Sequence, residues 1–289
     1  MIVNKVTITM QSFTETIQSE NPESILFIDG SYFCFHRYHS ILRWWRSAYP
    51  ETILEDPFKN EMFVQKFKKT FIETVSKLTK QLQLKNHKPF MIVGKDCKRE
   101  NIWRNSLYPS YKGTRVKDDD FMGGPFFKMV YDEGLFQLGG VRAILKHPQL
   151  EADDCIALSV MHILKAIPDT KINIITSDKD YLQLAGPRVN IFNLAYKNIT
   201  ENTLGGSAAA DLFCKIVMGD TSDNISSVLR KCGPKTALKC YQDREYFKER
   251  MKAENAYDKY ELNQNIIDFT RIPSNLVDEF MQDYACINA

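Results

Sequence analysis

The chain has 289 residues, of which 44% are hydrophobic and 26% charged, and its formal net charge is +2. This length suits one large or two modest domains, and the composition is that of an ordinary globular protein. The nearly neutral charge gives no argument for a nucleic-acid partner. No apolar run approaches the roughly 20 residues of a membrane span, so we expect no membrane segment.

The amino-terminal 24 residues are polar and lack the hydrophobic core of a signal peptide. They predict a short extension in which Val6–Met10 suits an edge strand. A buried strand is expected at residues 25–28, where an apolar run ends in Asp29 and a glycine. Apolar residues at helical spacing predict an amphipathic helix over residues 58–84, with its aromatic stripe in the core.

Cysteine usage predicts free thiols in a reducing, cytoplasmic compartment, because the seven cysteines are odd in number and include no Cys-x-x-Cys pair. Zinc bound through cysteine is therefore not expected. Cys34, His36 and His39 are close enough in sequence to suggest a small metal site, but a helix rich in aromatic residues explains them better.

A strand is predicted at residues 90–93, and Asp96 follows it. Residues 95–117 then shift in composition, with basic side chains interleaved by aromatic ones: Lys95, Lys98, Arg99, Trp103, Arg104, Tyr108, Tyr111, Lys112, Arg115 and Lys117. This pattern suits a phosphate backbone and stacked bases. A solvated loop with packed aromatics is an equal alternative.

Residues 118–125 mark a break, and the acidic triplet within them indicates a solvated run rather than a metal site. The elements predicted next are a helix ending near residue 138, a strand at 141–145, a helix at 151–164 and a strand at 172–176. Such alternation predicts an α/β fold with a mostly parallel sheet covered by helices. We expect an α/β domain over residues 1–205 and a helical region over residues 206–289.

Nine acidic residues fall in five short clusters at predicted ends of strands or helices: Asp29, Asp96, Glu151, Asp153, Asp154, Asp178, Asp180, Asp220 and Asp223. Carboxylates at the carboxyl ends of parallel strands line one crevice. A pair about 4 Å apart repels by roughly 4 kcal/mol at an effective dielectric near 20, so protons or cations must neutralise the cluster. Oxygen ligands suit Mg²⁺ or Mn²⁺, and two-metal phosphodiester hydrolysis is the first hypothesis.

Each cluster alone is a weak signal, and acids at 151–154 also suit a helix first turn. Their order and spacing together resemble the 5′-nuclease superfamily, which includes flap endonucleases, 5′ nuclease domains of bacterial DNA polymerases and phage ribonucleases H. The matching stretches are Phe-Ile-Asp29, Trp103-Arg104, Tyr111-Lys112-Gly-Thr-Arg115, Glu151-Ala-Asp-Asp154, Thr-Ser-Asp178-Lys-Asp180, Met-Gly-Asp220-Thr-Ser-Asp-Asn224, Gly233-Pro-Lys-Thr-Ala237 and Ile-Ile-Asp-Phe-Thr-Arg-Ile-Pro273.

The resemblance implies a PIN-like 5′-nuclease fold that holds two Mg²⁺ or Mn²⁺ ions. The first ion would be surrounded, directly or through water, by Asp29, Asp96, Glu151, Asp153 and Asp154. The second would be served by Asp178, Asp180, Asp220 and Asp223. The ions would activate a water and stabilise charge on the phosphate and leaving oxygen.

The resemblance also implies roles for the basic segment. Lys112 and Arg115 would grip the scissile phosphate, Arg104 would support this basic wall, and Tyr111 would stack on the terminal base. Residues 112–140 would form the arch through which a free 5′ end is selected.

A helix–three-turn–helix around Gly233 would hold duplex through backbone amides and Lys231, Lys235 and Lys239. Two positions depart from the family pattern. Lys231 replaces an early glycine of the hairpin, which puts a monovalent-ion site in doubt, and Lys179 replaces the glycine between the paired aspartates.

The sequence therefore predicts a monomeric 5′-3′ exonuclease and flap endonuclease with ribonuclease H activity. Its substrates would be 5′ flaps, nicked or gapped DNA and RNA–DNA hybrid, as in primer removal during replication. A single-strand-binding or sliding-clamp protein is a candidate partner. The alternatives are a catalytically silent nucleic-acid-binding protein of the same fold and a nuclease for single-stranded RNA.

Overall fold

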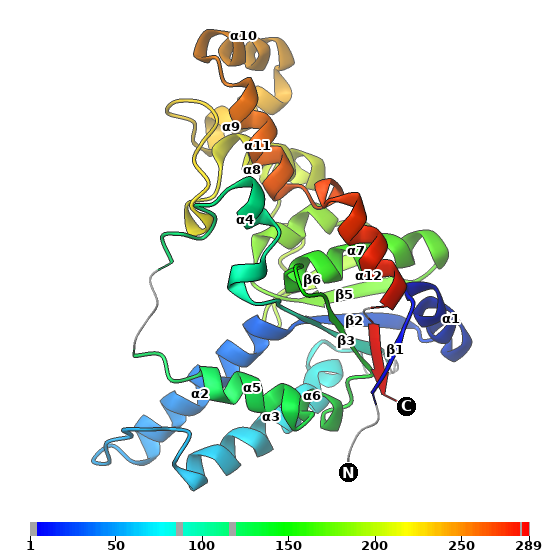
Figure 1. Cartoon of the computed structure of the whole chain (residues 1–289), viewed down its shortest axis with the longest axis vertical. Helices are drawn as coiled ribbons and strands as arrows, with labels where there is room; N and C mark the ends of the chain where they lie inside the picture. Colours follow the sequence, from blue (N-terminus) through cyan, green and yellow to red (C-terminus); the bar gives the residue numbers. More distant parts are fainter. Residues whose placement is uncertain (1–4, 85–88, 116–119, 284, 289) are drawn as a thin grey trace.

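The computed structural model describes residues 5–84, 89–115, 120–283 and 285–288. Its centre is a seven-stranded sheet in the order β1-β7-β4-β3-β2-β5-β6 (Figure 1). The strands are β1 (Lys5–Ile8), β2 (Ser24–Asp29), β3 (Phe90–Lys95), β4 (Ala143–Lys146), β5 (Lys171–Ile175), β6 (Val189–Phe192) and β7 (Ala285–Asn288). The five strands from β4 to β6 in this order are parallel, while β7 and β1 run antiparallel at one edge.

Helices cover both faces of the sheet, which is why the central strands are apolar runs rather than alternating ones (Figure 1). One face packs against α1 (Met10–Glu20), α7 (Ala152–Ala166) and α12 (Ser274–Asp283). The other packs against α2 (Gly30–Ala48), α3 (Glu61–Gln81), α5 (Gly124–Asp132) and α6 (Leu135–Leu138). The α/β class predicted from the sequence is confirmed.

The predicted amphipathic helix over 58–84 is α3, and its aromatic stripe lies in the core as expected. Phe63, Phe67 and Phe71 are fully buried. The helix begins later than predicted because Asn60 caps it, with its Oδ1 accepting a hydrogen bond from Phe63 N at 2.9 Å.

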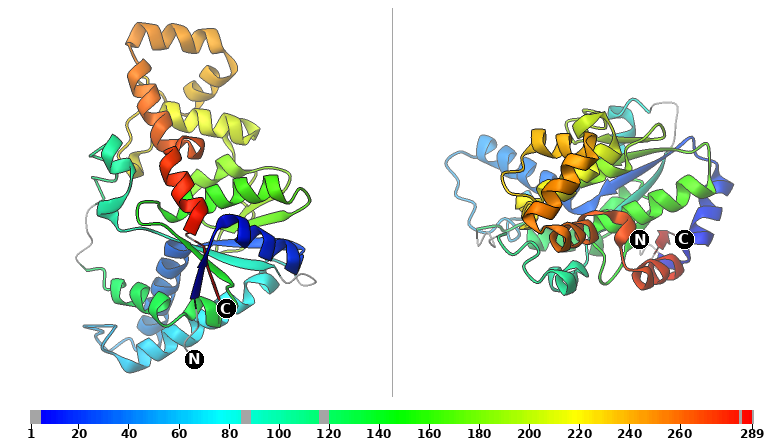
Figure 2. Two further views of the ribbon diagram at one scale, coloured as in Figure 1. Left: turned by 45° about the vertical axis from the view of Figure 1, so that its right-hand side comes forward. Right: turned by 90° about the horizontal axis from the view of Figure 1, so that it is seen from above.

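A separate helical group stands at one end of the sheet (Figure 2). It consists of α8 (Ala208–Met218), α9 (Pro234–Gln242), α10 (Arg244–Glu254) and α11 (Tyr257–Ile267). Short 3₁₀ turns connect the segments: η1 (Arg99–Asn101), η2 (Lys179–Leu184), η3 (Leu204–Gly206), η4 (Thr221–Asp223) and η5 (Phe269–Arg271), with a brief helix α4 at Arg104–Leu107. The helical group has a small core of its own, formed mainly by α8, α9 and α10.

The chain returns from this group to the sheet. Phe269, Leu276 and Phe280 are buried in the layer that contains α1 and α7, and β7 pairs with β1 and β4. The sequence did not predict β7, and the edge strand expected over Val6–Met10 is the shorter β1, because α1 begins at Met10 with Thr9 as its cap. The predicted division at residue 206 stays a prediction.

The segment predicted as an arch, residues 112–140, includes residues 116–119, which lie outside the described ranges. Its second half forms α5 and α6, and Phe126, Val130 and Phe136 are fully buried against α2 and α3. A free-standing arch therefore does not extend through α5 and α6 in this arrangement. Gly123, which is buried, immediately precedes α5.

Three further expectations concern the cysteines, a small metal site and a membrane segment. The cysteines whose side chains are described are free. Within these residues, no cluster with metal-ligand geometry forms around Cys34, His36 and His39; Cys34 is fully buried in the core. Across the described ranges, no helix has the length and apolar character needed to cross a bilayer.

Candidate active site

A cleft of about 1010 Å³ opens where β2, β3 and β5 end, and it extends to the start of α9. Six of the nine predicted acidic residues line it: Asp29, Asp96, Glu151, Asp153, Asp178 and Asp220. Asp154, Asp180 and Asp223 do not line the cleft, but each contacts a residue that does. Five segments far apart in sequence therefore converge, and the ends of β2, β3 and β5 meet here because these strands are parallel.

Asp29 ends β2 and caps α2. Its Oδ1 accepts a hydrogen bond from Tyr32 N at 3.0 Å, and its Oδ2 accepts one from Thr176 Oγ1 at 3.2 Å. Burial, followed by the charges of Asp96 and Asp178, raises the pKa of the Asp29 carboxyl from 3.8 to about 7. The carboxylate is thus held in place by neutral donors that do not balance its charge.

Asp96 follows β3 and joins it to α7. Its Oδ1 accepts a hydrogen bond from Ala152 N at 2.7 Å, at the start of that helix, and the Ser31 hydroxyl donates to its Oδ2. Neither Asp29 nor Asp96 forms an ion pair within the described ranges. This part of the cleft gathers negative charge without a cation from the chain.

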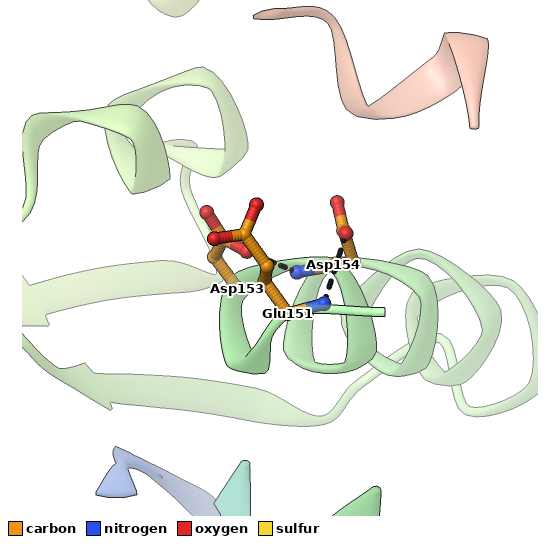
Figure 3. A group of neighbouring side chains, drawn as sticks. All are labelled: Glu151, Asp153 and Asp154. Carbon is orange, nitrogen blue, oxygen red and sulfur yellow. Dashed lines mark hydrogen bonds between the residues drawn. The ribbon is translucent and has the colours of Figure 1, made fainter. Parts of the chain in front are cut away.

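The first turn of α7 carries the predicted acidic cluster (Figure 3). Ligand oxygens of Glu151, Asp153 and Asp154 all lie within 4.8 Å of one another. Glu151 and Asp154 form a capping box, with Asp154 Oδ2 accepting a hydrogen bond from Glu151 N at 3.2 Å. Figure 3 shows the carboxylates of Glu151 and Asp153 on one side of the turn and that of Asp154 apart from them. Burial, followed by Asp154 and Glu151, raises the pKa of Asp153 well above its usual value.

Arg104 forms ion pairs with the first turn of α7. Its Nη1 and Nη2 donate to Asp154 Oδ2 and Oδ1, each at 2.7 Å, and Nη1 also donates to Glu151 Oε2 at 3.1 Å. Trp103 Nε1 donates to Asp154 Oδ2 at 2.9 Å. Arg104 is 3% exposed and Asp154 is fully buried. Arg104 was expected to support the basic wall that faces nucleic acid. In the structure it neutralises buried carboxylates and is not exposed to a nucleic-acid strand. Both oxygens of Asp154 already accept hydrogen bonds from Arg104.

Lys112 and Arg115 line the cleft, where the sequence placed them. Lys112 Nζ pairs with Glu151 and lies 3.9 Å from Asp223 Oδ2. Burial opposes the charge on Lys112, but Glu151 and Asp153 outweigh it and raise the pKa of the amine. Arg115 Nη2 lies 2.5 Å from Asp223 Oδ1, and its side chain is 49% exposed. Both cations can turn toward an anion in the cleft.

Tyr111 has a different position from the one expected. The residue is only 6% exposed, so a nucleic-acid base cannot stack on its ring in this arrangement. Its hydroxyl lies 3.0 Å from Glu151 Oε2 and 3.1 Å from Asp223 Oδ2. Burial raises the pKa of the Tyr111 phenol far above its usual range, so the group stays protonated. The Tyr111 hydroxyl therefore lies between the two acidic groups, within hydrogen-bond distance of one carboxylate of each.

The second acidic group is built on turns rather than on strand ends. Asp178 and Asp220 cap the 3₁₀ turns η2 and η4, and Asp180 lies within η2. Lys215 of α8 pairs with Asp180 and lies 3.0 Å from Asp220 Oδ2. Burial tends to raise the pKa of Asp220, but Lys215 and hydrogen bonds from Ser222 outweigh it and lower that pKa to about 2.

Asp178 differs from its neighbours in this group, because its pKa is raised. Desolvation in the cleft is the largest cause, and Lys215 opposes it. Asp178 is also close enough to Asp29 to raise the pKa of that residue. Asp178 therefore connects the two acidic groups across the cleft.

Sequence reasoning missed Lys215, as well as the hydroxyl donors Ser31 and Thr176. Lys215 is part of an amphipathic helix and has the appearance of an ordinary surface lysine. Its spacing of five residues before Asp220 is the only local signal. Its contact with Asp180 depends on how α8 packs against η2.

The predicted duplex-binding hairpin is α8, η4 and α9. Gly233 caps α9 and lines the end of the cleft. Lys231, Lys235 and Lys239 are exposed, and Lys239 Nζ lies 3.9 Å from the ring centroid of Tyr246. Lys231 has φ of 49°, in the left-handed region that favours glycine. Lys231 therefore adopts a backbone conformation at which glycine would be favoured.

Comparisons with known proteins show the family of the chain. Residues 24–209 match the family described as "5'-3' exonuclease, N-terminal resolvase-like domain". Ribonuclease H of Enterobacteria phage T4 is 33% identical over 216 residues, which are 65% of this chain and 67% of that protein. DNA polymerase I of Treponema pallidum is 34% identical over 153 residues, but these cover 48% of this chain and only 14% of the polymerase.

A further relative, the 5'-3' exonuclease of Buchnera aphidicola subsp. Acyrthosiphon pisum, is 30% identical over 162 residues, and the match covers 53% of this chain and 52% of the exonuclease. Among solved structures, the T5 D15 protein co-crystallized with metal ions has a TM-score of 0.61 at 16% identity, covering 89% of this chain and 97% of that one. A complex of the T5 D15 flap endonuclease with DNA and metal ions gives 0.60 at 14% identity, with 89% and 96% coverage. At these identities, the structural likeness concerns the fold.

Proposed function

Because this chain belongs to the 5′-3′ exonuclease family, we propose that it is a structure-specific 5′ nuclease that removes RNA primers and flaps during DNA replication. Its substrates are 5′ flaps, nicked or gapped duplex and RNA–DNA hybrid. One observation carries this proposal: six carboxylates from five separate segments line a single cleft together with Lys112 and Arg115.

The side chains of the cleft fit divalent metal ions. Asp29 and Asp153 have raised pKa values because burial and neighbouring carboxylates leave their charge unbalanced. Their ligand atoms are hard oxygens, which suit Mg²⁺ and Mn²⁺. Asp29, Asp96 and Asp153, with Glu151, would hold one ion.

A second ion would be held by carboxylates of the other group, chosen from Asp178, Asp180, Asp220 and Asp223. Metal ions in such a pair supply an activated water and neutralise charge on the phosphate. We propose two ions, with Mg²⁺ as the physiological one.

The chain itself would position the substrate. Lys112 and Arg115 would hold the scissile phosphate, Lys112 as a point charge and Arg115 through its planar fork. Lys112 would exchange its contact with Glu151 for the phosphate. The hairpin residues Lys231 and Lys235 would contact phosphates of the duplex without reading bases.

The test uses Asp29→Asn and Asp178→Asn, one from each acidic group, with labelled 5′-flap DNA and an RNA-primed duplex in Mg²⁺. Both variants should lose cleavage, while Asp258→Asn, which changes an exposed residue of α11, should retain it. Undiminished cleavage by both site variants would contradict the metal assignment. Tight binding by the wild type without turnover in Mg²⁺ and Mn²⁺ would instead favour the silent nucleic-acid-binding alternative.

The products of the two substrates would also separate exonuclease from flap-endonuclease action, and cleavage of unstructured RNA would favour the single-stranded RNA nuclease. A monomeric state, a cytoplasmic location and a single-strand-binding or sliding-clamp partner remain predictions from the sequence.

A further inference from the structure

Lys215 has an unusual position for a lysine of an amphipathic helix. It lies in the carboxyl-terminal half of α8, and its side chain is only 15% exposed. Its ammonium pairs with Asp180 Oδ1 and lies 3.0 Å from Asp220 Oδ2. These two acids come from different segments, η2 and the turn after α8. Lys215 and Asp220 both line the cleft.

We propose that Lys215 is an internal counter-ion of the second acidic group, whose ammonium neutralises Asp180 and Asp220 in the metal-free protein and must leave before a divalent ion binds between them. The inference rests on the two-ion function proposed above. It makes Lys215 a positioning residue that sets the affinity of the second metal position, separate from Lys112 at the phosphate.

The physical argument is one of competition. The carboxylate oxygens that contact the ammonium are those that a metal ion would need, and a positive charge that stays nearby repels a second cation. Of the carboxylates proposed for the first ion, Asp29, Asp96 and Asp153 have no ion pair to break within the described ranges, whereas Glu151 pairs with Arg104 and Lys112. The two metal positions should therefore fill in order, with the position at Asp29 first and the position at Asp180 second.

A purely structural salt bridge gives the opposite expectation. If Lys215 only fastened η2 to α8, its removal would let Asp180 and Asp220 separate, and the second metal position would become weaker. As a counter-ion, Lys215 competes with the metal, so its removal makes the second position stronger. The sign of the change in affinity decides between the two.

The experiment measures Mn²⁺ binding to the full chain by isothermal titration calorimetry and by electron paramagnetic resonance of free Mn²⁺. In Lys215→Met, the dissociation constant of the weaker step should fall by roughly tenfold, the scale of effect that one adjacent charge has on a proton. The stronger step should change little. Lys215→Gln removes the charge but keeps a hydrogen-bond donor, so it tests the same effect with less risk to folding.

The matched control is Lys179→Met. Lys179 lies between Asp178 and Asp180 in sequence, is exposed and lines the cleft, but it forms no ion pair in the described part of the chain. Lys179→Met should not lower the dissociation constant of the weaker Mn²⁺ step comparably.

Thermal unfolding gives an independent measurement. The Lys215 variants should unfold at a lower temperature than the wild type in EDTA, and their unfolding temperature should rise more on addition of Mn²⁺.

A second step that is unchanged or weaker in both Lys215 variants would overturn the counter-ion role, as would an equal tightening in Lys179→Met. If metal-dependent cleavage is intact in that case, the proposed nuclease function stands. A wild-type protein that cleaves with a single bound Mn²⁺ would overturn the two-ion function and this inference together.

Discussion

The two walls of the cleft neutralise their acids in different ways. The sheet wall, with Asp29 and Asp96 at the ends of β2 and β3, carries no ion pair on these residues within the described ranges. The opposite wall, called the helical wall, is formed by η2, α8 and η4. On this wall Lys215 pairs with Asp180 and Asp220, and Arg115 pairs with Asp223. Strand order places the first set together whatever its charge, whereas turns beside a helix can recruit a cation locally. The need for a metal ion is therefore greatest on the sheet wall.

This comparison of the two walls depends on Arg104, the buried cation that pairs with Glu151 and Asp154 beside the sheet wall. Arg104→Met should lower the free energy of unfolding by about 3–5 kcal/mol, because it leaves the charge of Asp154 buried without a partner. Urea unfolding in EDTA measures this loss. Arg46→Met, on the exposed end of α2, should change stability by less than about 0.5 kcal/mol. Equal effects of the two variants would show that the Arg104–Asp154 pair does not support the wall.

Asp29 provides the next test, because its unbalanced charge should destabilise the metal-free protein. Its folded pKa of about 7 lies above its usual 3.8, so the folded state binds this proton more tightly than the unfolded state does. The stabilisation from that proton is complete below about pH 4 and is lost as the pH rises through 7. Asp29→Asn should therefore stabilise the protein in EDTA by about 2–4 kcal/mol at pH 8, and by much less at pH 5.

Urea unfolding of wild type and Asp29→Asn at both pH values measures this difference, with Asp258→Asn as the control. Added Mn²⁺ should abolish the advantage of the variant at pH 8, because the ion then supplies the missing charge. A gain of equal size at pH 5 and pH 8 would contradict an origin in the charge of Asp29.

Much of the sheet wall could be predicted from sequence. Asp29 and Asp96 of the sheet wall each follow a short apolar run, as does Asp178 of the second acidic group, and parallel strands bring such ends to one edge. The position of Lys112 in the cleft also agrees with its motif. That the three aspartates line one cleft could be predicted, because it needs only a local pattern and the rule for strand order.

The contacts that neutralise the acids could not be predicted in the same way. Arg104 and Asp154 are 50 residues apart, and Tyr111 and Asp223 are 112 apart. Which side of a four-residue helix or a short turn faces inward is decided by tertiary packing, so the sequence did not predict that Arg104 and Tyr111 would be buried against these carboxylates. The strand β7 was missed for a similar reason: its four residues gain order by pairing with β1 and β4.

Lys112 connects the two walls, since it pairs with Glu151 and approaches Asp223. Lys112→Ala should slow single-turnover cleavage by roughly 10²-fold, or about 3 kcal/mol, while duplex affinity changes little, because its proposed contact is with the reacting phosphate. Rapid-quench kinetics and fluorescence anisotropy measure the two quantities. Lys112→Arg should recover part of the rate. A change in affinity alone would make Lys112 a positioning contact.

The smallest effect is expected at the far end of the helical wall, where Lys235 is exposed near the start of α9. Lys235→Ala should weaken duplex binding by roughly threefold to tenfold, equally for different base sequences, and should reduce the salt slope by about one. Lys252→Ala, on the exposed surface of α10 in the same helical group, should leave both quantities unchanged. Fluorescence anisotropy over a range of salt concentrations measures them. An unchanged slope in Lys235→Ala would show that the helical wall neutralises its own acids but does not extend to the duplex through this lysine.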